Sequence, residues 1–126
     1  MAAGLTLDAD ALIAAEKNSR EFWALWKLAI QRDARITIPA VVLAQAWRGN
    51  SPAIARLLPA CVVEPVDESV AKRIGTFLGR TRQTDVVDAA VVVSALARGD
   101  AIVTPDPEDI RRLLGKARGR VRIVAV

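Results

Sequence analysis

The chain has 126 residues, of which 52% are hydrophobic, and carries a formal net charge of +4. A chain of this length and composition can bury one hydrophobic core, so we expect a single domain over residues 1–126. It contains no histidine and a single cysteine, Cys61, which excludes an internal disulfide, a Cys/His zinc site and a histidine-based catalytic triad. Any chemistry must therefore use carboxylates, amides, hydroxyls or cationic side chains.

Short apolar runs alternate with helical patterns along the first half of the chain. Asn18 or Ser19 is suited to cap the second helix, because short polar side chains accept hydrogen bonds from free N–H groups at helix starts. The elements expected here, in chain order, are a strand over residues 4–7, a helix over 10–16, a helix with an apolar stripe over 22–30, a strand over 36–38, a helix over 40–47 that ends at Gly49, and a short helix opened by Ser51 and Pro52.

The second half continues the alternation. Asp67 and Thr84 are suited to cap two helices, and Asp106 with Pro107 starts the last one. The elements expected here are a strand over 61–66, a helix with apolar residues from 70 to 78, a strongly apolar helix that stops at Gly99, a strand over 101–104, a helix from 107, and a strand over 121–126. Strands that alternate with helices predict an α/β fold, with a mostly parallel central sheet flanked by helices on both faces, since parallel neighbours need crossover connections of this length.

The sequence offers no sign of a membrane segment. No run approaches the roughly 18 uninterrupted apolar residues that a span requires. The N-terminal segment has Asp8 where a secretory signal would keep apolar residues, so we expect a cytoplasmic protein. The positive charge permits attraction to an anionic partner such as nucleic acid, but it does not identify one.

Four aspartates are candidates for one cluster. Asp8 directly follows the first strand and Asp106 lies just past the fourth, and in parallel sheets functional residues gather outside the carboxyl ends of the strands. Asp85 and Asp88 are three residues apart in the first turn of the apolar helix, so they share a face. Crowded carboxylates repel unless one is protonated or a cation compensates them, and oxygen ligands suit Mg²⁺ or Mn²⁺. Each aspartate also has an ordinary structural explanation as a helix cap, a helix-dipole partner or a turn residue.

Four segments occur in the order and spacing of a known family: LTLDADALIA, ITIPAVVLAQAWRG, DVVDAAVVVSALARG and AIVTPDPEDI. Over nearly the whole chain they resemble PIN domains, especially the VapC-like toxins of VapBC toxin-antitoxin systems. The resemblance maps the metal-site acids of the family onto Asp8, Asp88 and Asp106. It leaves Asp10 at a position usually held by a small polar residue, and Pro105 where the family has a serine.

Gln45 departs from this pattern, because the family has a glutamate at the aligned position of the second segment. An amide oxygen can still contact a metal-bound water, but it carries no charge and cannot act as a general base. The glutamine is either an amide-for-carboxylate replacement that silences the enzyme or a natural variant with altered metal use.

The resemblance implies a Mg²⁺- or Mn²⁺-dependent endoribonuclease, a hydrolase that acts as the toxin of a type II toxin-antitoxin pair. Its catalytic residues would be Asp8, Gln45, Asp88 and Asp106. The three aspartates among them would bind metal. Asp85 and Asp109 are second-rank candidates, and Thr104 is placed to orient an aspartate.

The resemblance also implies partners. A toxin of this kind is held by a cognate VapB-type antitoxin, pairs as a homodimer, and takes RNA as its substrate. Trp23, Trp26 and Trp47 would either line the antitoxin groove or belong to the core. Arg80 and Arg82, just before the Asp88 helix, would either meet a phosphate backbone or lie solvated in a loop.

Two alternatives stay open. A catalytically weakened or inert PIN-like module would bind RNA or a protein partner without cutting, and Gln45 is the residue that supports it. A doubly wound domain of the response-regulator kind also gathers aspartates at the end of a sheet, but that class uses a lysine after a late strand, and no lysine lies between Lys72 and Lys116.

Overall fold

The structure is a computed structural model that describes residues 4–117 and 121–126. Five strands form one sheet in the order β3-β2-β1-β4-β5, and every neighbouring pair is parallel. The strands are β1 Leu5–Leu7, β2 Ile36–Pro39, β3 Val62–Glu64, β4 Ala101–Thr104 and β5 Ile123–Ala125. The predicted α/β class with a parallel sheet is confirmed, and the order differs from the 2-1-3-4-5 order of response regulators, which excludes that alternative.

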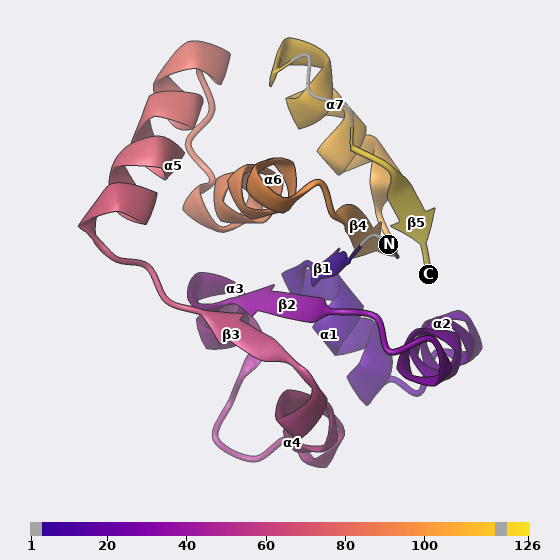
Figure 1. Cartoon of the computed structure of the whole chain (residues 1–126). Helices are drawn as coiled ribbons and strands as arrows, with labels where there is room; N and C mark the ends of the chain where they lie inside the picture. Colours follow the sequence, from indigo (N-terminus) through magenta and orange to yellow (C-terminus); the bar gives the residue numbers. More distant parts are fainter. Residues whose placement is uncertain (1–3, 118–120) are drawn as a thin grey trace.

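Helices cover both faces of this sheet (Figure 1). On one side lie α5, α6 and α7, and on the other α1, α2 and α4, while α3 contacts both α1 and α6. The helices are α1 Ala9–Glu16, α2 Arg20–Gln31, α3 Ala40–Ala46, α4 Pro52–Leu57, α5 Glu68–Thr81, α6 Val86–Arg98 and α7 Pro107–Ala117, with a 3₁₀ turn at Leu58–Ala60. The central strands β2 and β4 are buried throughout, as expected when both faces of a parallel sheet are covered.

Side-chain caps fix where several helices begin. The side chains of Ser19, Ser51 and Asp67 accept hydrogen bonds from the N–H groups of the residues three positions later, which confirms those predicted starts. The apolar helix α6 is capped by Asp85 and not by Thr84 as predicted, because the Asp85 carboxylate accepts from Asp88 N at 3.0 Å. This helix ends at Gly99, whose φ of 72° is the left-handed conformation that glycine adopts without strain.

The strand predicted over 61–66 is shorter than expected. The 3₁₀ turn Leu58–Ala60 precedes it, and β3 covers only Val62–Glu64. Pro65 follows directly, and proline has no N–H to donate to a sheet. β3 is also an edge strand, so it is paired on one side only.

Candidate metal and catalytic site

Asp8 occupies the point where β1 ends and α1 begins. Asp8 is 5% exposed, and its Oδ1 accepts a hydrogen bond from Ala11 N at 2.7 Å. Asp8 is therefore the N-cap of α1. β1 lies in the middle of the sheet between β2 and β4. Asp8 is therefore held by backbone geometry at the carboxyl edge, the side of the sheet where the strands end.

Burial raises the pKa of Asp8 to about 7. Removal from water is the largest cause, and the nearby carboxylates of Asp10 and Asp88 raise the pKa further. The Thr104 hydroxyl and the Ala11 N–H act in the opposite direction, because both hydrogen-bond to the charged form. An aspartate of this kind changes its charge near neutral pH, which is typical of functional sites.

Three other acidic residues act on the charge of Asp88. It is half-buried in the first turn of α6, and burial raises its pKa. Repulsion from Asp85, Asp10 and Asp106 raises it further, in that order of size. The structure therefore brings five carboxylates into electrostatic contact, which we call the aspartate cluster: Asp8, Asp10, Asp85, Asp88 and Asp106.

Thr104 links two parts of this cluster. It is the last residue of β4 and is fully buried, and its hydroxyl accepts a hydrogen bond from Asp106 N at 3.0 Å. The same hydroxyl also acts on the carboxyl group of Asp8, whose pKa it lowers. Thr104 thus holds the backbone of Asp106, just past β4, and lowers the pKa of Asp8, just past the neighbouring strand β1; the orienting role stays a prediction.

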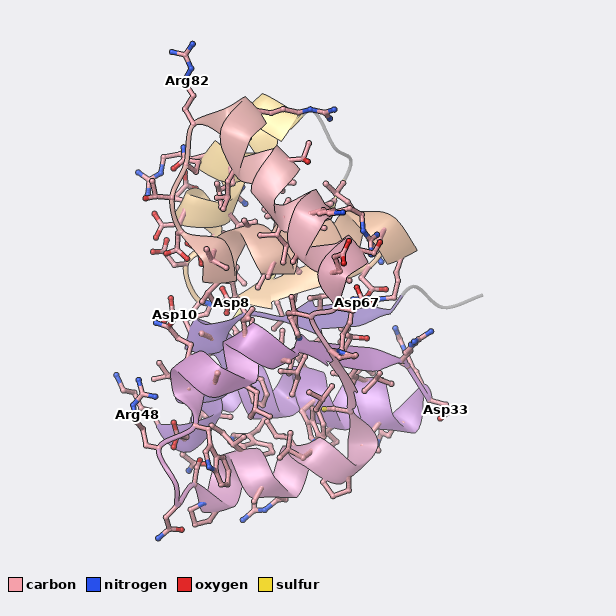
Figure 2. All side chains as sticks on the ribbon, turned by 90° about the vertical axis from the view of Figure 1, so that its left-hand side faces the viewer. Asp8, Asp10, Asp33, Arg48, Asp67 and Arg82 are labelled. Atoms are coloured by element: carbon pink, nitrogen blue, oxygen red, sulfur yellow. The ribbon has the colours of Figure 1, made fainter. Side chains whose placement is uncertain are left out.

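Asp10 is the member of the cluster that the motif comparison did not assign. It is exposed in the first turn of α1, two residues after Asp8, and it contributes to the raised pKa of both Asp8 and Asp88. The sequence signal for this membership was the position of Asp10 two residues after Asp8, in the segment Asp8-Ala9-Asp10. Figure 2 shows Asp8 and Asp10 together at one edge of the molecule.

Gln45 and Asp109 stand apart from these contacts. Gln45 is exposed near the end of α3, a helix that packs against both α1 and α6. No hydrogen bond of Gln45 to the aspartate cluster occurs among the described contacts. Asp109 is paired with Arg112 one turn along α7.

The donor chemistry of the cluster fits a hard divalent cation. Its ligands are all oxygens, and no lysine or arginine of the described residues forms an ion pair with Asp8, Asp88 or Asp106. In residues 4–117 and 121–126, however, no three carboxylates already converge as a metal-binding group. Ligation would therefore require the more exposed side chains to close toward Asp8.

The predicted basic and aromatic residues divide between several places. Arg82 adopts φ 54° after α5 and projects from the molecule (Figure 2). Arg80 lines a groove between α5 and α6. The three tryptophans are partly buried and pack against the main core, which agrees with their core interpretation: Trp23, Trp26 and Trp47. Within the described residues, no helix is both long and apolar enough to span a membrane.

Comparison with solved structures identifies the fold. The chain is similar to a chain of VapBC2 from Rickettsia felis bound to a DNA fragment from their promoter, with a TM-score of 0.72, 14% identity, and coverage of 97% of this chain and 98% of that chain. It is also similar to DNA-bound VapBC from Salmonella typhimurium, with a TM-score of 0.69, 20% identity and 98% coverage of both chains. A toxin-antitoxin complex from Klebsiella pneumoniae gives a TM-score of 0.68, 14% identity and 97% coverage of both.

Comparison by sequence finds no relative: no protein-family model and no curated protein matches the chain. The structural matches extend over essentially the whole of both chains, so they concern the complete arrangement of strands and helices. In fold, the chain is a PIN-like α/β protein similar to those of the VapBC toxin-antitoxin complexes.

Proposed function

We propose that the chain is the toxin of a type II toxin-antitoxin pair and that it cuts RNA as a Mg²⁺- or Mn²⁺-dependent endoribonuclease in the cytoplasm. The observation that carries the proposal is Asp8, buried at the carboxyl edge with a pKa of about 7 that the carboxylates of Asp10 and Asp88 help to raise. Its place in a fold shared with VapBC proteins supports the toxin assignment.

Asp8, Asp88 and Asp106 are the proposed metal ligands, and Gln45, exposed on the nearby helix α3, is the fourth proposed functional residue. A bound divalent ion would supply Lewis-acid activation of a water and charge stabilisation at the phosphate. Asp8 has to lose its proton to act as a ligand, so ligation at neutral pH releases protons. Thr104 keeps the Asp8 carboxyl in a fixed orientation while this happens.

The partners follow from the same assignment. The similar structures from Rickettsia, Salmonella and Klebsiella are toxin-antitoxin complexes, so we propose a VapB-type antitoxin as the partner of this chain. RNA is the proposed substrate, and a homodimer is the proposed assembly. Arg48, exposed along the same edge as Asp10 in Figure 2, is positioned to approach a phosphate backbone beside the cluster.

The test is cleavage of a defined RNA in the presence of Mn²⁺, Mg²⁺ or EDTA. We expect cleavage with either metal, none with EDTA, and a loss of at least about 100-fold in Asp88→Asn, as for removal of a group that stabilises transition-state charge. Asp33→Asn is the matched control, because Asp33 is exposed at the opposite edge of Figure 2 and its φ of 53° suits asparagine. Cleavage that persists in EDTA, or that Asp88→Asn leaves unchanged, would refute the proposal.

The second candidate function is a PIN-like module that binds RNA or a protein without cutting. Gln45 favours it, since a neutral amide cannot accept a proton from a water. In the same experiment this module would bind the RNA, as seen by gel shift, and leave it intact at every metal concentration.

A further inference from the structure

A groove of about 630 Å³ lies between α5 and α6, away from the residues of the aspartate cluster. Its walls come from two helices that Figure 1 shows side by side above the sheet. We call it the α5–α6 groove, and its lining residues are Lys72, Arg73, Thr76, Phe77, Arg80, Thr81, Val93, Leu96 and Ala97.

The two walls differ in chemistry. Arg73, Phe77 and Arg80 follow one face of α5 at helical spacing, so an apolar ring is flanked by two cations. Val93, Leu96 and Ala97 follow one face of α6 and are entirely apolar. From residue 72 to residue 81 the cationic wall is roughly 14 Å long at the rise of an α-helix.

The cations of this groove are not compensated within it. No carboxylate is among the lining residues in the described part of the chain. Lys72 pairs with Glu68 at 2.6 Å, but both side chains are more than two-thirds exposed, at 75% and 83%, so water screens the pair. Among the described residues, Arg73 and Arg80 form no ion pair.

We propose that the α5–α6 groove binds an acidic amphipathic helix of a protein partner. Such a helix places apolar side chains against Phe77 and the α6 wall, and its carboxylates beside Arg73 and Arg80. Amphipathic helices recognise grooves between two helices in this way, through apolar anchors spaced three and four residues apart. The proposal is independent of whether the aspartate cluster cuts RNA.

Other occupants fit less well. In a symmetric pair of copies the same surface meets itself, so each groove would face a second set of the same cations and no lining carboxylate to compensate them. Single-stranded nucleic acid binds through several stacking aromatic side chains, and among the residues that the structure describes Phe77 is the sole aromatic one lining the groove.

The experiment selects peptides of about 16 residues, enough for roughly four helical turns, from a random display library on the wild-type protein. Peptides that also bind the double variant Arg73→Glu/Arg80→Glu are removed. We expect the remaining peptides to carry aspartate or glutamate together with apolar residues at three- and four-residue spacing. Their affinity should fall at least tenfold in the double variant and in Ala97→Glu, which fills the groove from its exposed apolar wall.

The matched control is Arg20→Glu/Lys27→Glu on α2. It reverses two exposed cations that are also seven residues apart on one helix, so net charge changes equally. Peptide affinity should be unchanged in this control, and circular dichroism should show all variants folded. The proposal is overturned if no peptide survives the counter-selection, if the survivors lack acidic residues, or if Ala97→Glu binds them as the wild type does. It is equally overturned if sedimentation shows that Arg73→Glu/Arg80→Glu converts a dimer to a monomer, because a second copy then occupies the groove.

Discussion

Two sets of interactions act in opposite directions on the pKa of Asp8. As the N-cap of α1 it accepts a hydrogen bond from Ala11 N, an interaction that favours the carboxylate form. Burial and the neighbouring Asp10 and Asp88 favour the protonated form. Their combined effect exceeds that of the hydrogen bonds, since the pKa of Asp8 is raised to about 7. The native state therefore binds a proton at a pH where the unfolded chain does not.

The stability of the protein should consequently fall as pH rises between about 4 and about 7. The unfolded Asp8 titrates near 3.8 and the native one near 7, so in this window unfolding releases a proton and higher pH favours it. From pH 5 to pH 8 we expect Asp8 to account for a loss of about 2 to 3 kcal/mol in unfolding free energy. Urea denaturation in EDTA at both pH values, for wild type and Asp8→Asn, measures it.

The asparagine introduced by Asp8→Asn keeps an amide oxygen for the Ala11 N–H but has no proton to lose. The variant should therefore lose this part of the pH dependence and gain stability over wild type at pH 8. Identical pH dependence in the two proteins would show that the pKa of Asp8 lies near its ordinary value.

Gln45 is the residue at which a single change tests the proposed chemistry. Gln45→Glu should tighten Mn²⁺ binding and raise RNA cleavage at least tenfold, because a carboxylate adds charge beside the ion and can accept a proton, a role worth about 10² to 10⁴ in rate. In EDTA the variant should be slightly less stable than wild type, since it adds like charge, and it should recover with metal. Cleavage across a Mn²⁺ titration and melting temperatures provide the measurements.

Gln31→Glu is the control for this change, because Gln31 is also an exposed glutamine near the end of a helix. It should leave cleavage and metal dependence unchanged. If Gln45→Glu behaves as Gln31→Glu does, Gln45 does not stand at the metal-site position and the alignment of the second segment is wrong.

At the scale of elements, α6 is tied to the sheet by one polar network. Arg98 donates to Asp100 Oδ2 at 2.9 Å, to Thr6 Oγ1 at 3.0 Å and to Ser94 Oγ at 2.6 Å, and it also pairs with Glu64. The guanidinium thus connects α6 with β1, with β3 and with the start of β4. The helix that presents Asp88 is in this way fixed against β1, the strand that Asp8 directly follows.

Arg98→Met should cost about 3 to 5 kcal/mol of unfolding free energy, because it leaves the carboxylate of Asp100, whose side chain is 3% exposed, without its cation. Arg111→Met is the control, since its pair with Glu108 lies on the surface and should change stability by less than about 1 kcal/mol. Urea denaturation at pH 7 compares the two. Adding Asp100→Asn to Arg98→Met should restore part of the loss, and equal stability of Arg98→Met and wild type would contradict the role given to the network.

The order and type of the elements were predictable because their signals are local. Periodic apolar residues and capping side chains such as Ser19 and Asp67 act within a few residues of their own position. Boundaries failed where two local signals competed. Thr84 and Asp85 are both good caps, and the structure uses Asp85; the apolar run 61–66 favoured a longer strand, which Pro65 interrupts.

At the scale of the whole molecule, the candidate site follows from a rule about parallel sheets. Because strands end at one edge, Asp8 and Asp106 were expected there, and the parallel pairing of β1 with β4 places them just past the ends of adjacent strands. The raised pKa of Asp8 depends on tertiary burial and was not accessible from sequence, whereas the contribution of Asp10 was signalled only by its position two residues after Asp8. The catalytic and metal-binding roles of these residues remain predictions.

Metal binding should stabilise the whole fold if the aspartate cluster holds an ion. A ligand bound by the native state alone adds about 2.7 kcal/mol at 100 times its Kd, and relief of repulsion among Asp8, Asp88 and Asp106 contributes to that affinity. For a chain of this size each kcal/mol corresponds to roughly 3 to 5 °C in melting temperature. Melting curves in EDTA and in millimolar Mn²⁺, at matched ionic strength, should therefore differ clearly for wild type and for Asp33→Asn. They should coincide for Asp88→Asn, because this variant loses the half-buried carboxylate of the cluster. Coincident curves for the wild type would mean that the cluster does not hold Mn²⁺, whereas a shift that persists in Asp88→Asn would place the ion elsewhere on the protein.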